Sequence, residues 1–120
     1  FTEPYDRELR QMILLSASDV GVPAHAAAVY GATQGPRLET AAEIDRMERD
    51  GCDVVGMTGM PEAGLARELG IDYANISLVV NPAAGRSTGE ITMADIEREL
   101  AQGMGRIRAV IVALTKRLAP

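Results

Sequence analysis

Short apolar runs alternate along this chain with segments that have the spacing of amphipathic helices, and this alternation limits the possible folds most strongly. The apolar runs cover residues 24–33, 53–57 and 71–80. Helices are predicted over residues 6–18, 40–50, 61–69 and 92–118. Strands that alternate with helical segments of about 10–15 residues indicate a parallel sheet covered by helices. We therefore predict an α/β fold with a mostly parallel sheet.

Capping signals set the predicted starts of three helices. Asp6 precedes the first helical stretch, and its carboxylate is suited to accept a backbone N–H there. Thr40 with Glu43, and more loosely Thr92 with Asp95, have the spacing of a capping box. These three helices are therefore expected to begin within a residue or two of these positions.

The last helix has a long apolar stripe with glycines inside it. Its apolar residues recur every three or four positions: Ile96, Leu100, Met104, Ile107, Ile111, Leu114 and Leu118. Gly103 and Gly105 interrupt this pattern and are expected to weaken the helix, because glycine loses more backbone freedom than alanine. The stripe predicts that one face of the helix packs on the rest of the domain.

Three predicted strands are few for a complete open sheet, which has about five or six on average. We therefore expect residues 1–120 to be the back part of a single larger domain whose N-terminal half lies outside this chain.

Charge and cysteine content exclude several classes of protein. The net charge is −5 and the pI is near 4.8, whereas domains that bind nucleic acid usually have a pI above about 9. No stretch approaches the roughly 20 apolar residues of a membrane span. Cys52 is the only cysteine, which fits a reducing compartment such as the cytoplasm. No metal-ligand spacing is present, so no metal site is predicted.

Ligands of open parallel sheets bind beyond the carboxyl ends of the strands. Three predicted segments lie there, at residues 33–39, 57–62 and 81–89, with Glu39, Thr58 and Asn81 as their polar candidates. Thr58 stands just before Pro61, where unpaired backbone N–H groups of a helix start favour an anion such as phosphate. Taken alone, each residue also has a local explanation: Thr58 as a helix cap, Glu39 as a first-turn acid and Asn81 as a turn former.

Four motifs in this order resemble one known family. They are FTEPYDRELR at 1–10, GPRLET at 35–40, GMTGMPE at 56–62 and SLVVN at 77–81. Together they are similar to the C-terminal half of the trimeric purine nucleoside phosphorylase and methylthioadenosine phosphorylase family. The resemblance implies a helix-covered sheet of the nucleoside phosphorylase type, a homotrimer, and no cofactor. It also implies a pentosyltransferase activity in purine salvage, in which inorganic phosphate is the co-substrate and attacks the anomeric carbon of a purine nucleoside.

The resemblance also implies roles for individual residues. Thr58 would contact phosphate, and Met57 would border the ribose. Leu38 would pack against the base, and Tyr30 would line the pocket wall. Glu39 and Asn81 would read the purine, with Asn81 acting catalytically as the leaving base gains its proton.

Hydrogen-bond chemistry then predicts the base. A 6-oxopurine presents N1–H, which the Glu39 carboxylate accepts well, whereas adenine presents a lone pair that an ionised Glu39 repels. Asn81 donates to O6 and accepts from N7–H. The adenine-specific branch that this chain resembles has Asp at the Asn81 position and lacks the Glu. We therefore expect hypoxanthine-type bases to be preferred over adenine.

Met93 predicts the other end of the substrate. Related purine nucleoside phosphorylases have a His near the start of the last helix, and Ile91-Thr92-Met93 falls at that place. A thioether cannot serve a 5′-hydroxyl, but it packs well against a methylthio group. The predicted reaction converts 5′-methylthioinosine and phosphate to hypoxanthine and 5-methylthioribose 1-phosphate. The alternatives are a general inosine and guanosine phosphorylase, a methylthioadenosine phosphorylase, or a nucleoside-binding or nucleoside-hydrolase domain of similar fold.

Overall fold

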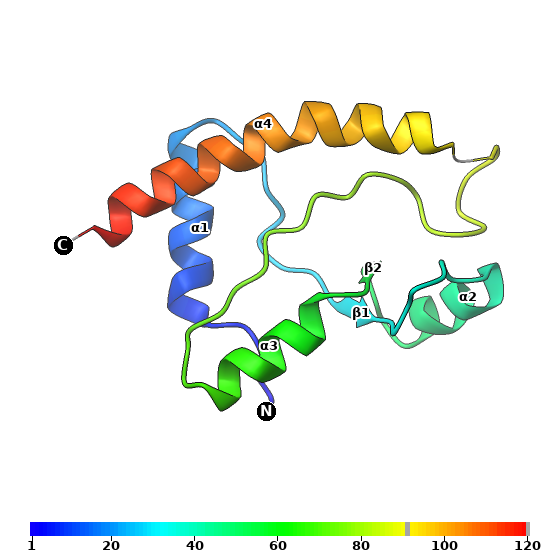
Figure 1. Cartoon of the computed structure of the whole chain (residues 1–120), viewed down its shortest axis with the longest axis horizontal. Coiled ribbons are helices and arrows are strands. Elements are labelled where there is room, and N and C mark those ends of the chain that lie inside the picture. The colour runs from blue at the N-terminus through cyan, green and yellow to red at the C-terminus, as the bar shows by residue number, and fades with distance from the viewer. Residues whose placement is uncertain (91, 120) are drawn as a thin grey trace.

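The computed structural model describes residues 1–90 and 92–119 of the chain. Four helices and two short strands follow one another along the sequence (Figure 1). The order is α1 (Arg7–Asp19), β1 (Tyr30–Ala32), α2 (Ala41–Arg49), β2 (Val54–Gly56), α3 (Gly59–Glu68) and α4 (Met93–Leu118).

The predicted helix starts of α1, α2 and α4 are confirmed. The carboxylate of Asp6 accepts the backbone N–H of Leu9 at 2.7 Å, which satisfies one of the unpaired donors of α1. Thr40 and Thr92 each form a complete capping box with the acidic residue three positions on. Only α3 differs, because it begins at Gly59 and so takes Pro61 into its first turn.

The two strands pair in parallel, as predicted. Tyr30 lies opposite Val54, and Ala32 lies opposite Gly56. The first strand is shorter than the predicted range 24–33, since only residues 30–32 have strand partners. Its start is held instead by Asp53, whose carboxylate accepts the N–H of Val29 at 2.7 Å.

The third predicted strand, residues 71–80, is wrong as a strand: this segment carries no ladder in the structure. Figure 1 shows it crossing the molecule from the end of α3 towards the start of α4. One backbone hydrogen bond, from Asp6 N–H to Tyr73 C=O at 2.7 Å, ties its beginning to the start of α1. An apolar run becomes a strand only beside a neighbour that supplies hydrogen bonds. The sheet formed by the described residues has two strands and does not reach this segment.

Helices α1 and α4 pack against each other. Ser16 and Ala17 of α1 and Val110 of α4 are buried, and an ion pair between Arg117 and Asp19 joins the ends of the two helices. The chain also contains no described helix whose length and apolar content suit a bilayer crossing.

Gly103 has a packing role that the sequence did not predict. The position is buried, and a Cβ placed there would overlap the side chain of Leu78. Gly103 therefore lets α4 approach the segment that crosses beneath it. Gly105, two residues on, has open space at the same place.

Candidate functional site

Glu39 lies at the carboxyl edge of the two-stranded sheet. Thr33, the residue after β1, donates its N–H to the carbonyl of Gly56 at 2.9 Å and so continues the parallel pairing. The hydroxyl of Thr33 donates to Oε1 of Glu39 at 2.7 Å and approaches the Gly56 carbonyl at 3.4 Å. Glu39 is half-buried. The predicted placement of this acid beyond the strand ends is therefore confirmed.

Met57 lies against the same loop. It follows β2 directly, and its sulfur is 2.6 Å from the position that a Cβ on Gly35 would take. Gly35 also has a φ of 64°, a conformation that side chains disfavour, so the backbone of the loop favours glycine here. Leu38 of this loop is 76% exposed and packs little on its own chain.

Tyr30 covers the start of α3. Its hydroxyl accepts from the backbone N–H groups of Thr58 and Gly59, each at 3.4 Å. Its ring lies 3.1 Å from the Cβ position of Gly59, and a Cβ on Gly56 would overlap its hydroxyl. The glycines of the motif at 56–62 thus make room for the Tyr30 ring. The expectation that the N–H groups at this helix start are unpaired is corrected, because two of them point at Tyr30.

The side chain of Thr58 is exposed and forms no capping hydrogen bond with α3. The capping explanation of this residue is therefore wrong for the structure. Its hydroxyl stands at the positive end of the α3 dipole and is not used by the helix.

Arg37 braces the outer side of the loop. Its guanidinium makes hydrogen bonds of 2.9 and 2.8 Å to the two carboxylate oxygens of Glu43 and one of 3.0 Å to the carbonyl of Leu38. The Arg37 contact, with help from Thr40, holds the pKa of Glu43 well below its usual range. The loop carrying Glu39 is thus fixed by Thr33 on one side and by Arg37 on the other.

Asn81 belongs to a third segment, which reaches α2. Asn81 is half-buried, and its Nδ2 donates to the carbonyl of Pro82 at 2.8 Å, as in the turn-forming alternative. Further along, Gly85 packs on Ala41 at the start of α2. Arg86 forms ion pairs of 2.9 and 2.5 Å with two carboxylates of α2. The segment therefore lies beside the helix that follows Glu39, although no hydrogen bond links Asn81 to Glu39 among the described residues.

Met93 is the first residue of α4 and is 68% exposed. The start of α4 lies towards the same end of the long axis as α2 (Figure 1). Ile91, part of the same predicted motif, lies outside the described residues.

Two tyrosines stack beside α3. The rings of Tyr5 and Tyr73 are 6.1 Å apart, and Tyr73 donates a hydrogen bond to Glu62. Burial, together with the Glu62 carboxylate, raises the pKa of Tyr73 to about 12, and burial also raises the pKa of Tyr5. Both phenols therefore stay neutral at physiological pH. The chain also offers no described group of three or more His, Cys, Asp or Glu side chains that suits a metal ion.

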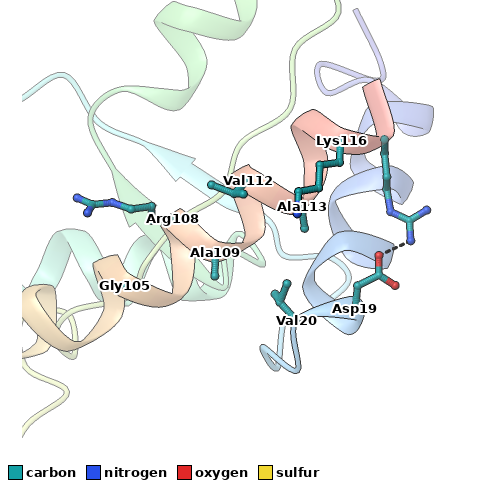
Figure 2. Close-up of a pocket in the computed structure, with 9 residues that line it drawn as sticks. Asp19, Val20, Gly105, Arg108, Ala109, Val112, Ala113 and Lys116 are labelled. Carbon is teal, nitrogen blue, oxygen red and sulfur yellow. Dashed lines mark hydrogen bonds and ion pairs between the residues drawn. The ribbon is translucent and has the colours of Figure 1, made fainter. Parts of the chain in front are cut away.

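A cavity of about 640 Å³ lies elsewhere, between the end of α1 and the second half of α4 (Figure 2). Val20, Ala109 and Val112 supply its apolar wall, and the ion pair between Asp19 and Arg117 closes one side. The predicted site residues do not line it.

The fold is that of an α/β protein with a parallel sheet, a class in which ligands bind beyond the carboxyl ends of the strands. Residues 1–116 match the family described as the Phosphorylase superfamily, and the chain belongs to this superfamily. The resemblance drawn from the four sequence motifs is thereby confirmed.

Two curated relatives and one solved structure illustrate the similarity. A "Probable S-methyl-5'-thioinosine phosphorylase" of Pseudomonas syringae pv. tomato is 57% identical over 111 residues, which are 92% of this chain and 45% of that protein. A 6-oxopurine nucleoside phosphorylase of Pyrococcus furiosus is 48% identical over 80% of this chain and 36% of its own length. A Schistosoma purine nucleoside phosphorylase in complex with hypoxanthine is 30% identical, with a TM-score of 0.83 over 98% of this chain and 43% of that chain. This chain thus spans less than half the length of these relatives.

Proposed function

We propose that residues 1–120 form the C-terminal part of a single nucleoside phosphorylase domain, and that the protein cleaves 6-oxopurine nucleosides with phosphate. Its preferred substrate is 5′-methylthioinosine. A phosphate oxygen forms a bond to C1′ of the sugar while the bond from C1′ to N9 of the base breaks. The electron pair of that bond leaves with the base, which gains one proton and is released as hypoxanthine. Hydrogen phosphate loses one proton as its oxygen becomes the ester oxygen of the sugar phosphate, so the protons balance. The other product is 5-methylthioribose 1-phosphate.

The position of Glu39 is the observation that carries this proposal. Its carboxylate is half-buried at the carboxyl edge of the sheet, held through one oxygen by Thr33. A fixed carboxylate accepts the N1–H of a 6-oxopurine and repels the N1 lone pair of adenine. Asn81 binds O6 and N7 and stabilises the departing base. One Nδ2–H of its amide donates to the Pro82 carbonyl, and the second Nδ2–H and Oδ1 serve the base. The hypoxanthine complex of the Schistosoma relative supports a 6-oxopurine base.

The phosphate and the sugar occupy the next positions along this edge. The uncapped hydroxyl of Thr58, at the start of α3, donates to phosphate. Met57 borders the ribose, Tyr30 forms the wall behind Thr58, and Leu38 presents an exposed apolar surface to the base.

Met93 is the residue proposed to contact the 5′-methylthio group of the substrate. Its exposed thioether at the start of α4 offers an apolar contact for a methylthio substituent and no hydrogen bond for a hydroxyl. The name of the Pseudomonas syringae relative supports this choice. The proposal also includes a homotrimer, a cytoplasmic location, a role in purine salvage and no cofactor beyond phosphate as co-substrate.

The test uses the full-length protein that carries this chain. Initial rates are measured with and without phosphate on 5′-methylthioinosine, 5′-methylthioadenosine and inosine. We expect phosphate-dependent turnover that is fastest on methylthioinosine. Fastest turnover of methylthioadenosine would exclude the role of Glu39, and equal rates without phosphate would show a hydrolase.

A general 6-oxopurine nucleoside phosphorylase is the second candidate, favoured by the similarity to the Pyrococcus furiosus protein. In that case inosine would be turned over faster than methylthioinosine, which would exclude the role of Met93 but leave that of Glu39. The variant Asn81→Asp checks the base separately, since it should shift the rate ratio towards 6-aminopurines.

A further inference from the structure

We propose that Thr33 is a positioning residue that sets the base preference by fixing the carboxylate of Glu39. The inference rests on the proposed function, in which Glu39 accepts the N1–H of a 6-oxopurine.

The contacts of Thr33 give it this role. Its backbone N–H is bound to the carbonyl of Gly56 at 2.9 Å, so its position is fixed by the parallel pairing of β1 and β2. Its hydroxyl donates to Oε1 of Glu39, six positions further along the chain, at 2.7 Å. A rigid sheet edge thus holds a side chain that stands on a loop.

The hydrogen bond from Thr33 also makes the two oxygens of the Glu39 carboxylate different. Oε1 of Glu39 is occupied by Thr33, and no described residue donates a hydrogen bond to Oε2. Because the Thr33 hydroxyl donates its single proton to Oε1, the other oxygen is left to accept from a ligand. Without this contact, the carboxylate of Glu39 rotates freely. Binding of the base must then fix the carboxylate, and this ordering reduces the affinity for the base.

The ion pair between Arg37 and Glu43 on the outer side of the loop does not replace the contact of Thr33 with Glu39. Arg37 and Glu43 hold the backbone around Leu38, but they make no hydrogen bond with the carboxylate of Glu39 in the described structure. Removal of the Thr33 hydroxyl is therefore expected to free the side chain of Glu39 while the loop stays in place.

The experiment compares four variants of the full-length protein: Thr33→Val, Thr33→Ser, Glu39→Gln and Thr115→Val. Valine keeps the shape of threonine and suits a strand edge, so the fold is preserved while the donor is lost. Serine keeps the donor. The side-chain hydroxyl of Thr115 donates to the Val112 carbonyl within α4, and this residue serves as the matched control. The readouts are kcat and KM with inosine-type and adenosine-type substrates.

We expect Thr33→Val to raise KM for the 6-oxopurine about tenfold, as for a lost hydrogen bond to a charged group. It should change kcat little, since the contact with N1–H exists both before and during the reaction. The ratio of kcat/KM for the 6-oxopurine over that for the 6-aminopurine should fall by a similar factor. Thr33→Ser and Thr115→Val should stay within about twofold of the parent.

Three results would overturn the inference in different ways. If Glu39→Gln lowers the ratio but Thr33→Val does not, the base is read by Glu39 without help from Thr33. If neither variant changes the ratio, Glu39 does not read the base, and the proposed function fails together with the inference. Equal losses in Thr33→Val and Thr33→Ser would show a packing role and also reject the positioning by hydrogen bond.

Discussion

Glycines in the site act by leaving space for particular side chains. Gly56 ends β2 under the hydroxyl of Tyr30, and Gly59 begins α3 under the ring of the same tyrosine. Gly64, in the middle of α3, has open space where a side chain would stand. Gly56 and Gly59 are therefore constrained by the Tyr30 side chain, whereas Gly64 has room for a side chain.

The variants Gly56→Ala and Gly64→Ala should therefore change stability in opposite directions. Gly56→Ala forces Tyr30 from its place and is expected to cost about 1–3 kcal/mol of unfolding free energy, the range for overpacked positions. Gly64→Ala should stabilise α3 by about 0.5–1 kcal/mol, because alanine loses less backbone freedom than glycine in a helix. Urea denaturation of the two variants and the parent measures both effects. A neutral Gly56→Ala would mean that Tyr30 does not pack as described.

Helix α4 depends on its neighbours as much as on its own sequence. Its capping box and apolar stripe predict a helix, and α4 spans Met93–Leu118 as a single element. Gly103 faces Leu78 closely, whereas Gly105 faces open space. Only the first glycine is therefore required for packing.

This difference predicts the outcome of a matched pair within one helix. Gly103→Ala should destabilise the protein by about 1–3 kcal/mol through the clash with Leu78, despite the better helix propensity of alanine. Gly105→Ala should stabilise it by up to about 1 kcal/mol. Thermal unfolding followed by circular dichroism tests the pair. Stabilisation by both variants would show that α4 does not pack closely against Leu78 at Gly103.

The molecule as a whole is open for its length. Its radius of gyration is 15.6 Å, against roughly 14 Å for a compact domain of this size. Leu69, Ile71 and Val79 are 73%, 58% and 65% exposed, and they lie at the end of α3 and in the segment that was predicted as a strand. These residues are of the apolar types that usually form a core, but their side chains are exposed to solvent.

The 120-residue chain studied alone should therefore behave as a loosely packed protein. We expect it to bind a hydrophobic dye such as ANS, because exposed apolar surface attracts such dyes. Its urea transition should be shallow, with an m-value at or below the low end of the usual range of about 1–3 kcal/mol/M. The same measurements on the full-length protein are the control. A steep transition without dye binding would contradict the exposed apolar surface.

Features that depend on neighbours along the chain could be predicted from the amino-acid sequence. Asp6, Thr40 and Thr92 start their helices as predicted, because a cap needs only the N–H groups two or three residues on. The parallel pairing of β1 and β2 followed from the alternation of elements, and the motifs placed Glu39 and Met57 beyond the strand ends.

Features that depend on residues far apart in the sequence became visible only in the folded chain. Residues 71–80 have a strand composition but form no strand, since hydrogen bonds between strands require a neighbour in space. The roles of Thr33 and Gly103 likewise arise from Glu39 and Leu78, which no local pattern links to them. A cap is closed by residues three positions apart, whereas a packed or hydrogen-bonded pair forms only when the folded backbone brings its two members together.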